Sequence, residues 1–335
     1  MENLRAEANE FLPSADSSVD PNVELIPGLD ENKHLRYADQ CNGQLESTNI
    51  LAGGCLHTFD SGTQLWTKYS RITKDIDFEA EKYSSVVFKG NNTFVVSGGF
   101  DGTNALNKVQ EISMQLGYEN NYEEKVRKLQ NLQERRYLHY SLVFRDTIYV
   151  MGGQLDKETY LSSCERLTER GWEVLPAMNK SRSCFSAFAT SNFIFVAGGF
   201  DGFQSNVQGI EKLNPQTMTW EEVKVDFQMY AGMGVVVRDL QGTDVWLVGG
   251  SNGENVFPRI LKFNSETGET QENTQTALCI ARARPIILRS RKNFFVFGGG
   301  SEVGEFWEGE AGTMLDYGPD LNTYHQVVYP YFNKQ

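Results

Sequence analysis

Four basic residues share one spacing along the chain. Lys82, Arg136, Arg182 and Arg282 each lie 16 residues before the first glycine of a Gly-Gly pair. Guanidinium groups bind carboxylates through paired hydrogen bonds, which give both affinity and orientation. One interpretation is that the four cations meet at one rim and bind an acidic segment of a partner protein. The alternative is that each arginine belongs to the repeated unit itself and donates hydrogen bonds to loop carbonyls.

Aromatic and polar residues accompany these cations in the same loops. Tyrosine and phenylalanine beside arginine are typical of the residues that dominate the binding energy of protein interfaces. The predicted partner-binding set therefore also contains Tyr83, Phe100, Tyr137, Gln154, Phe200, Tyr230, Ser251 and Tyr324.

Residues suited to metal or nucleophilic chemistry are few. The sequence has four His, and they do not combine with Cys, Asp or Glu at a metal-ligand spacing. It shows no Gly-rich phosphate loop and no nucleophile elbow. His139 lies in an apolar strand, where a packed histidine is expected. We expect a non-catalytic protein with no metal and no cofactor.

The overall charge disfavours polyanionic partners. The chain has 31 Lys+Arg against 44 Asp+Glu, a formal net charge of −13, which argues against nucleic acid and anionic membranes as ligands. No stretch approaches the roughly 20 apolar residues of a membrane helix, and the first residues lack a signal-peptide pattern. The five Cys form no Cys-x-x-Cys pair and are expected to be reduced. These features predict a cytoplasmic protein, with a nuclear location as the alternative.

Six short apolar strands, each ending in a glycine pair, must position the predicted site. The first glycines are at 53, 98, 152, 198, 249 and 298, so the spacings are 45, 54, 46, 51 and 49 residues. Four-stranded propeller blades repeat at roughly 40 to 50 residues. Glycine suits the end of such a strand because neighbouring backbones crowd there and leave no room for a side chain. We number the repeats as units one to six.

Each unit also carries other strands around its glycine strand. A strand precedes it, and a third strand and often a Trp-led fourth strand follow, with Trp66, Trp172 and Trp220 expected to pack between neighbouring units. Residues 117–128 interrupt the second unit and are interpreted as an insertion. The double glycine, the turn and the later Trp, best seen in Leu-Asn-Pro-Gln-Thr-Met-Thr-Trp at 213–220, resemble kelch repeats. The resemblance covers residues 46–335, and residues 1–45 form an acidic extension.

The resemblance implies an all-β, six-bladed kelch β-propeller with four antiparallel strands per blade. Residues 324–330 have the pattern of a first strand, so we expect this C-terminal strand to close the ring in the first blade. The domain is similar to that of BTB-kelch adaptors, although residues 1–45 cannot hold a BTB or BACK domain. This similarity implies a protein-binding adaptor or scaffold that recognises an acidic peptide and works with a cullin-type ubiquitin ligase. The alternatives are an actin-associated kelch protein and a sugar-acting kelch enzyme such as a mutarotase.

Overall fold

The computed structural model spans residues 1–335. The residues that it describes are 47–52, 55–60, 65–71, 83–90, 92–116, 121–202, 205–225, 228–237, 244–272, 277–278, 281–289, 293–297 and 324–328. The acidic extension predicted at residues 1–45 lies outside them. All regular secondary structure in the described residues is β-strand, and no helix there is long and apolar enough to span a membrane.

Units two to five are each built from four antiparallel strands in sequence order. Unit two contains β4 (Ser85–Gly90), β5 (Thr93–Ser97), β6 (Val109–Leu116) and β7 (Asn121–Lys128). Unit three contains β8 (Tyr140–Phe144), β9 (Thr147–Met151), β10 (Cys164–Thr168) and β11 (Gly171–Leu175). Unit four contains β12 (Ser186–Ala189), β13 (Ile194–Ala197), β16 (Ile210–Asn214) and β17 (Thr219–Val223). Unit five contains β18 (Gly234–Val237), β19 (Asp244–Val248), β20 (Ile260–Asn264) and β21 (Thr270–Glu272).

The two outer units have three described strands each. Unit one has β1 (Ser47–Ala52), β2 (Cys55–Asp60) and β3 (Leu65–Arg71), and a short parallel pairing of β3 with β7 joins it to unit two. Unit six has β22 (Ile286–Arg289), β23 (Asn293–Phe297) and β24 (Tyr324–Val328). A small hairpin of β14 (Phe200–Gly202) and β15 (Ser205–Asn206) follows the glycine pair of unit four.

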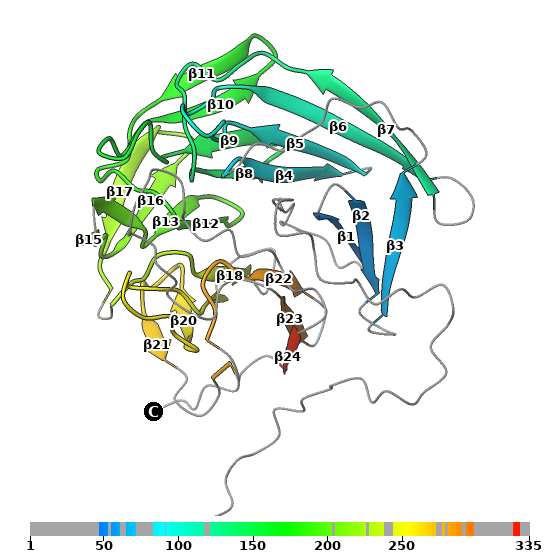
Figure 1. The fold of residues 1–335 in the computed structure, drawn as a ribbon. Coiled ribbons are helices and arrows are strands. Elements are labelled where there is room, and N and C mark those ends of the chain that lie inside the picture. The colour runs from blue at the N-terminus through cyan, green and yellow to red at the C-terminus, as the bar shows by residue number, and fades with distance from the viewer. Residues whose placement is uncertain are drawn as a thin grey trace, which may run out of the picture.

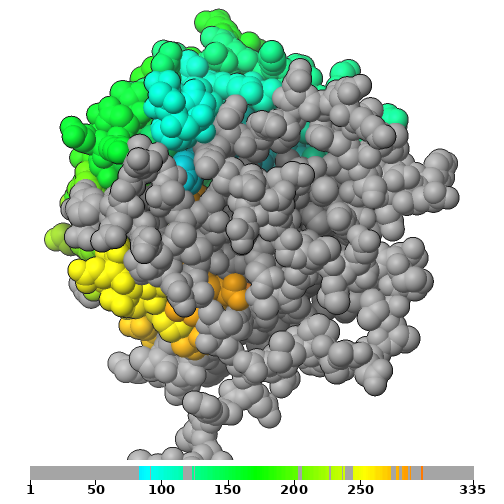
Figure 2. Space-filling model, viewed as in Figure 1, coloured from blue at the N-terminus to red at the C-terminus, as the bar shows by residue number. Residues whose placement is uncertain are grey.

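The units are arranged around a common centre. The first strands β4, β8, β12, β18 and β22 contact one another in that order. They lie innermost in Figure 1, while the fourth strands β7, β11, β17 and β21 lie farthest out. In Figure 2 the described surface is cyan near the upper centre, green at the top and on the left, and yellow and orange below. This all-β arrangement of antiparallel four-stranded sheets fits a kelch β-propeller.

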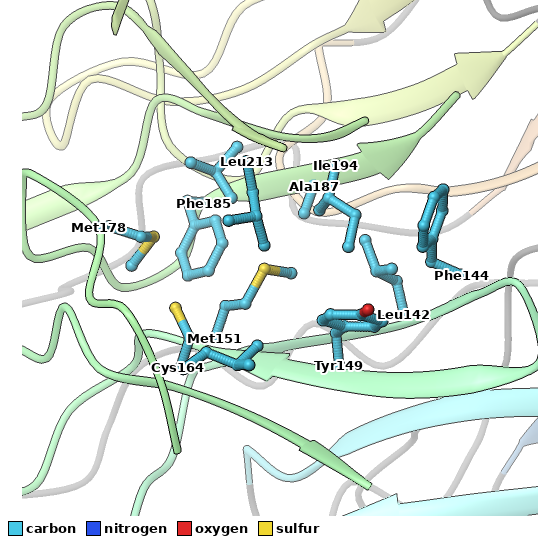
Figure 3. Close-up of a cluster of buried hydrophobic side chains, with 12 residues drawn as sticks. Leu142, Phe144, Tyr149, Met151, Cys164, Met178, Phe185, Ala187, Ile194 and Leu213 are labelled. Carbon is cyan, nitrogen blue, oxygen red and sulfur yellow. The ribbon is translucent and has the colours of Figure 1, made fainter. Parts of the chain in front are cut away.

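Apolar side chains from adjacent units form the core. Leu142 and Tyr149 of unit three pack in one buried cluster with Phe185 and Leu213 of unit four, and Figure 3 shows these side chains filling the space between the two sheets. Comparable clusters join units two and three and units four and five. The sheets are thus held together face to face by burial of apolar area.

The tryptophans of the fourth strands in units three and four confirm the packing expected of them, whereas the side chain of Trp66 lies outside the described part of the chain. Trp172 Nε1 donates to the Gln130 carbonyl at 2.8 Å, and Trp220 Nε1 donates to the Pro176 carbonyl at 2.9 Å. Gln130 follows the last strand of unit two and Pro176 that of unit three. Each of these indoles is therefore bonded to the preceding unit.

Two expectations from the sequence are wrong. The C-terminal strand β24 pairs antiparallel with β23, with Phe297 opposite Tyr324, and does not pair with β1. It therefore occupies the third-strand position of unit six, and the expected closure in the first blade is not found among the described strands. Residues 121–128, interpreted as part of an insertion, form the regular fourth strand of unit two.

Candidate protein-binding face

The glycine pairs mark the places where one unit touches the next. Gly152 has φ +59°, and a Cβ built on it would lie 2.6 Å from the Arg182 carbonyl oxygen. The following Gly153 donates its N–H to that same oxygen at 2.7 Å. The same bond recurs from Gly99 to Arg136, from Gly199 to Tyr230 and from Gly250 to Arg282. Glycine is required because the next unit's backbone approaches too closely for a side chain.

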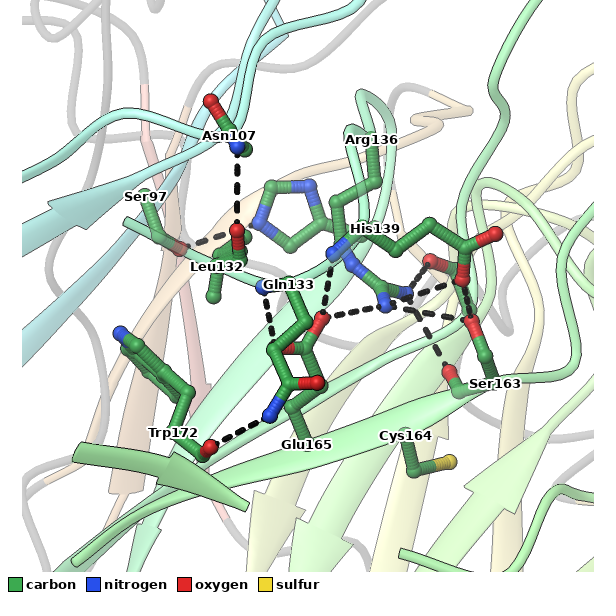
Figure 4. A network of polar contacts seen from close by, with 12 residues as sticks. Ser97, Asn107, Leu132, Gln133, Arg136, His139, Ser163, Cys164, Glu165 and Trp172 are labelled. Atoms are coloured by element: carbon green, nitrogen blue, oxygen red, sulfur yellow. Dashed lines mark hydrogen bonds and ion pairs between the residues drawn. The ribbon is translucent and has the colours of Figure 1, made fainter. Parts of the chain in front are cut away.

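Arg136 is the centre of a buried polar network, shown in Figure 4. Its Nη2 lies 2.9 Å from Glu165 Oε1, and its Nη1 donates to the Gly152 carbonyl at 2.7 Å. Both side chains are inside the protein, with exposed fractions of 0% and 2%. Glu165 also accepts the backbone N–H groups of Gln133 and Glu134. The pair thus ties the glycine strand, the third strand and the entering loop of unit three together.

Arg182 repeats the network in unit four. Its Nη2 lies 2.9 Å from Glu211 Oε1, its Nη1 donates to the Gly198 carbonyl at 2.7 Å, and its side chain is fully buried. Glu211 accepts the N–H groups of Asn179 and Lys180. Burial lowers the pKa of Arg182, and the Glu211 carboxylate opposes that shift. A buried charge is tolerated here because its partner is also bound to the backbone.

Unit five keeps the geometry but not the charges. Tyr230 replaces the arginine and Leu261 replaces the glutamate, and both belong to one buried apolar cluster. The Tyr230 ring stacks on Phe257 with centroids 4.2 Å apart, and the Arg259 guanidinium lies 5.0 Å from the Tyr230 ring centre. An ion pair and an apolar pair therefore fill equivalent positions in neighbouring units.

These contacts correct the prediction that the arginines bind a partner. The side chains of Arg136 and Arg182 are fully buried in internal ion pairs, and Arg282 is 4% exposed. They cannot present guanidinium groups to an acidic segment, and the alternative interpretation, bonding to loop carbonyls, holds for Arg136 and Arg182. Lys82 lies outside the described residues.

Most other members of the predicted set lie beneath the surface. Phe100 is partly exposed, and the side chain of Tyr324, in β24, is outside the described part. The buried members are Tyr83, Tyr137, Gln154, Phe200, Tyr230 and Ser251. The Tyr137 ring lies between those of Phe100 and Tyr83, with centroid distances of 5.1 Å and 6.1 Å, and burial raises its pKa to about 12. These residues pack beneath the surface loops and form almost none of the exposed surface.

A ring of left-handed residues lies two positions after each arginine position. Each backbone N–H in it donates to the carbonyl of the preceding member, from Arg284 to Gly232, Gly232 to Cys184, Cys184 to Leu138 and Leu138 to Tyr83. Their φ values run from +50° to +62°. Because these residues lie just before the innermost strands, this inner ring lies near the centre of the array. The sequence analysis missed it, although its signal is a fixed offset of two from Arg136, Arg182 and Arg282.

The loops after the glycine pairs emerge on the same face as the inner ring. Three of them end in a tip fixed by an Asx turn, in which one side-chain oxygen accepts two backbone N–H groups. The residues that supply this oxygen are Asp101, Asp156 and Asn252. The N–H groups hold the pKa values of Asp101 and Asp156 below the usual range. The tips are exposed, but their backbone is held in a defined shape.

His139 confirms the expectation of a packed histidine. Its Nε2 lies 3.0 Å from Ser97 Oγ, which also bonds Ser141 Oγ, and the ring is buried between units two and three. Burial, and next the charge of Arg136, hold its pKa well below the usual value. Among the described residues, no group of three His, Cys, Asp or Glu side chains is placed to hold a metal ion.

Comparison with known families identifies one kelch motif. The Kelch motif family matches residues 181–224, which span all strands of unit four. In a comparison with curated proteins, none matched the chain. The chain therefore contains a kelch motif within an all-β array of antiparallel sheets.

Proposed function

We propose that this protein is a non-catalytic, six-bladed kelch propeller that binds a protein partner on the face carrying the inner ring and the post-glycine loops. Kelch propellers serve in general as protein-interaction modules. The observation that carries the proposal is the set of exposed loop tips whose backbone is fixed by Asx turns. These tips lie on one face of β-sheets that are joined to one another by backbone hydrogen bonds. Binding surfaces are commonly built in this way, on shaped loops positioned by rigid sheets.

The charge of this face restricts the charge of the partners that it can bind. The exposed charged residues of the described loop tips are acidic except for one lysine, and they are Asp101, Asp156, Lys157, Glu158, Asp201 and Glu254. Because the arginines behind them are buried, a densely acidic partner is disfavoured. Roles as a ubiquitin-ligase adaptor or an actin-associated protein remain narrower predictions of the kelch resemblance.

Paired charge reversals on the two faces test the proposal. We would replace Glu158 and Glu254 with lysine on the loop face, and Glu169 and Glu266 with lysine in the opposite hairpins of the same two units. All four residues are exposed. Affinity purification from the native cells should lose a partner with the first pair and keep it with the second. The same partner list for both variants would contradict the proposal.

A further inference from the structure

Aromatic side chains from units two and three gather on the loop face. The Tyr137 ring lies 5.1 Å from the Phe100 ring and 6.1 Å from the Tyr83 ring, between centroids. These rings pack in one cluster with Cys184 of unit four. Tyr160, at the end of the loop of unit three, acts electrostatically on both Tyr137 and Cys184's neighbourhood. We call Tyr83, Phe100, Tyr137 and Tyr160 the aromatic cluster.

Backbone pairing directs two of these phenols to the same side. Tyr137 pairs with Gln154, and Gln154 pairs with Tyr160, both as antiparallel bridges. Directly paired residues carry their side chains on the same side of a sheet, so the three side chains face one way. The Gln154 side chain hydrogen-bonds the Tyr160 phenol. The Tyr137 hydroxyl makes no hydrogen bond with any described residue, although this side chain is only 9% exposed.

The two phenols lie in negative surroundings. Burial raises the pKa of Tyr160, and the Cys184 thiol and the Asp201 carboxylate add to this rise. After burial, Asp156 is among the groups that raise the pKa of Tyr137. The exposed Asp201 carboxylate makes no ion pair within the described part of the chain. Both phenols are therefore neutral at physiological pH, and their oxygens can accept hydrogen bonds.

A cation is the ligand that such surroundings favour. Aromatic faces attract ammonium and guanidinium groups, and carboxylates form strong hydrogen bonds with them. The exposed carboxylates of Asp156, Glu158 and Asp201 outnumber the neighbouring cations, which are Lys157 in the same loop tip and the partly exposed Arg284. An acidic side chain would be repelled here, and a neutral one would gain nothing from the charge.

We propose that the aromatic cluster binds one basic side chain, arginine or lysine, of a partner segment. The partly exposed Phe100 and Tyr160 contact its apolar stem, and the Tyr137 hydroxyl and the Asp201 carboxylate accept hydrogen bonds from its charged end. The inference rests on the proposed protein-binding function of this face. It gives the partner a charge opposite to that of the acidic peptide that the kelch resemblance implies.

Short peptides test this preference without a cellular partner. The complete chain would be labelled with 3-fluorotyrosine, and the fluorine signals of Tyr137 and Tyr160 would be assigned from their phenylalanine variants. Ac-Gly-Arg-Gly-amide and Ac-Gly-Lys-Gly-amide should shift both signals saturably at millimolar concentration. The uncharged citrulline peptide and the glutamate peptide should bind roughly fivefold more weakly. Equal binding of the arginine and citrulline peptides, or no shift with any peptide, would overturn the proposal.

Matched variants locate the site. Tyr137→Phe removes a hydroxyl without a described partner, so it should keep the wild-type unfolding midpoint and weaken binding of the arginine peptide roughly threefold. Asp201→Asn should weaken it similarly, whereas Glu169→Gln, the same charge change in an exposed turn of the opposite face, should not. Full affinity in Tyr137→Phe, or equal effects of the two charge changes, would contradict the proposal. If no peptide binds while the reversal at Glu158 and Glu254 still removes a partner, this site is wrong and the binding face stands.

Discussion

Glu211 holds three groups at once: the guanidinium of Arg182 and the backbone N–H groups of Asn179 and Lys180. Removing one member of such a buried pair leaves the other charged and without its counter-ion. Unit five shows what the fold accepts instead, because Tyr230 and Leu261 occupy the same two positions. The arginine position therefore serves the joint between units, whichever chemistry fills it.

Coupling between these two positions can be measured directly. We expect Glu211→Leu alone to lower the free energy of unfolding by roughly 3 to 5 kcal/mol, because it strands the Arg182 charge inside the protein. Adding Arg182→Tyr should recover a substantial part of that loss, since the unit then copies unit five. Urea unfolding of both single variants and the double variant gives the interaction energy. Strictly additive losses would show that the two residues do not act as a pair.

His139 should make stability depend on pH. Its folded pKa is lowered, so below about pH 6.5 the unfolded chain binds a proton that the folded protein does not. The stabilising contribution is complete above that pH and is lost as the pH falls towards the folded pKa. Phe185 occupies the equivalent place in unit four, against Gly199 as His139 lies against Gly153. His139→Phe should therefore weaken the fall in unfolding free energy between pH 7 and 5, and an identical pH profile would contradict this.

At the scale of elements, the second strands could be predicted because their signal is local. The strands β5, β9, β13, β19 and β23 all end immediately before a glycine pair, as the sequence predicts. An apolar run followed by two glycines has a physical explanation here: backbone of the next unit approaches the first glycine, and the segment leading into the first strand of the same unit approaches the second. The kelch resemblance of unit four is likewise confirmed at residues 181–224.

The spacing of 16 residues before the glycine pair does not identify equivalent positions in a unit whose strand pairing changes register. The hairpin of β4 and β5 shifts register between Phe88 and Gly90, which adds one residue to unit two. Tyr83 is therefore equivalent to Leu138 in the inner ring, and by the same count Lys82 corresponds to Tyr137 rather than Arg136. The position of β24 was also mistaken, because alternating apolar residues fit a first or a third strand equally well. Burial of the arginines could not be read from spacing, since an exposed and a buried arginine have the same sequence pattern.

Glycine substitutions separate close packing from backbone strain. Gly153 and Gly102 have similar φ values, +99° and +100°, but a Cβ on Gly153 would lie 2.6 Å from the Tyr137 carbonyl oxygen and one on Gly102 would meet nothing within 4 Å. Both alanine variants carry the conformational strain, and only Gly153→Ala adds the clash. Gly153→Ala should therefore lower the thermal midpoint clearly more than Gly102→Ala. Equal midpoints would mean that the segment leading into the first strand of the same unit does not press on the glycine.

A chemical cross-link tests the position of the C-terminal strand. Phe295 and Gln326 are paired across β23 and β24. Cysteines at these two sites should be joined efficiently by dibromobimane, and cysteines at Leu51 and Gln326 should not. Efficient linkage of the second pair would restore closure in the first unit and contradict the pairing described above.

At the scale of the whole molecule, the two faces of the array differ in how they are built. One carries the inner ring, the glycine pairs and the Asx-turn loops, and the other carries tight hairpins such as Asn214–Met218. Apolar clusters between units and buried ion pairs within them make the scaffold behave as one support for the loops. A partner bound to the first face would thus contact several units at once.

Hydrogen exchange of the complete chain, with and without the partner captured in the charge-reversal experiment, tests this account most directly. We predict new protection in the loops at 100–105, 154–160 and 251–256 and in the inner ring, with unchanged exchange in the hairpin turns at 169–170 and 265–268. Protection confined to those opposite turns or to the outer strands would contradict the assignment of the binding face.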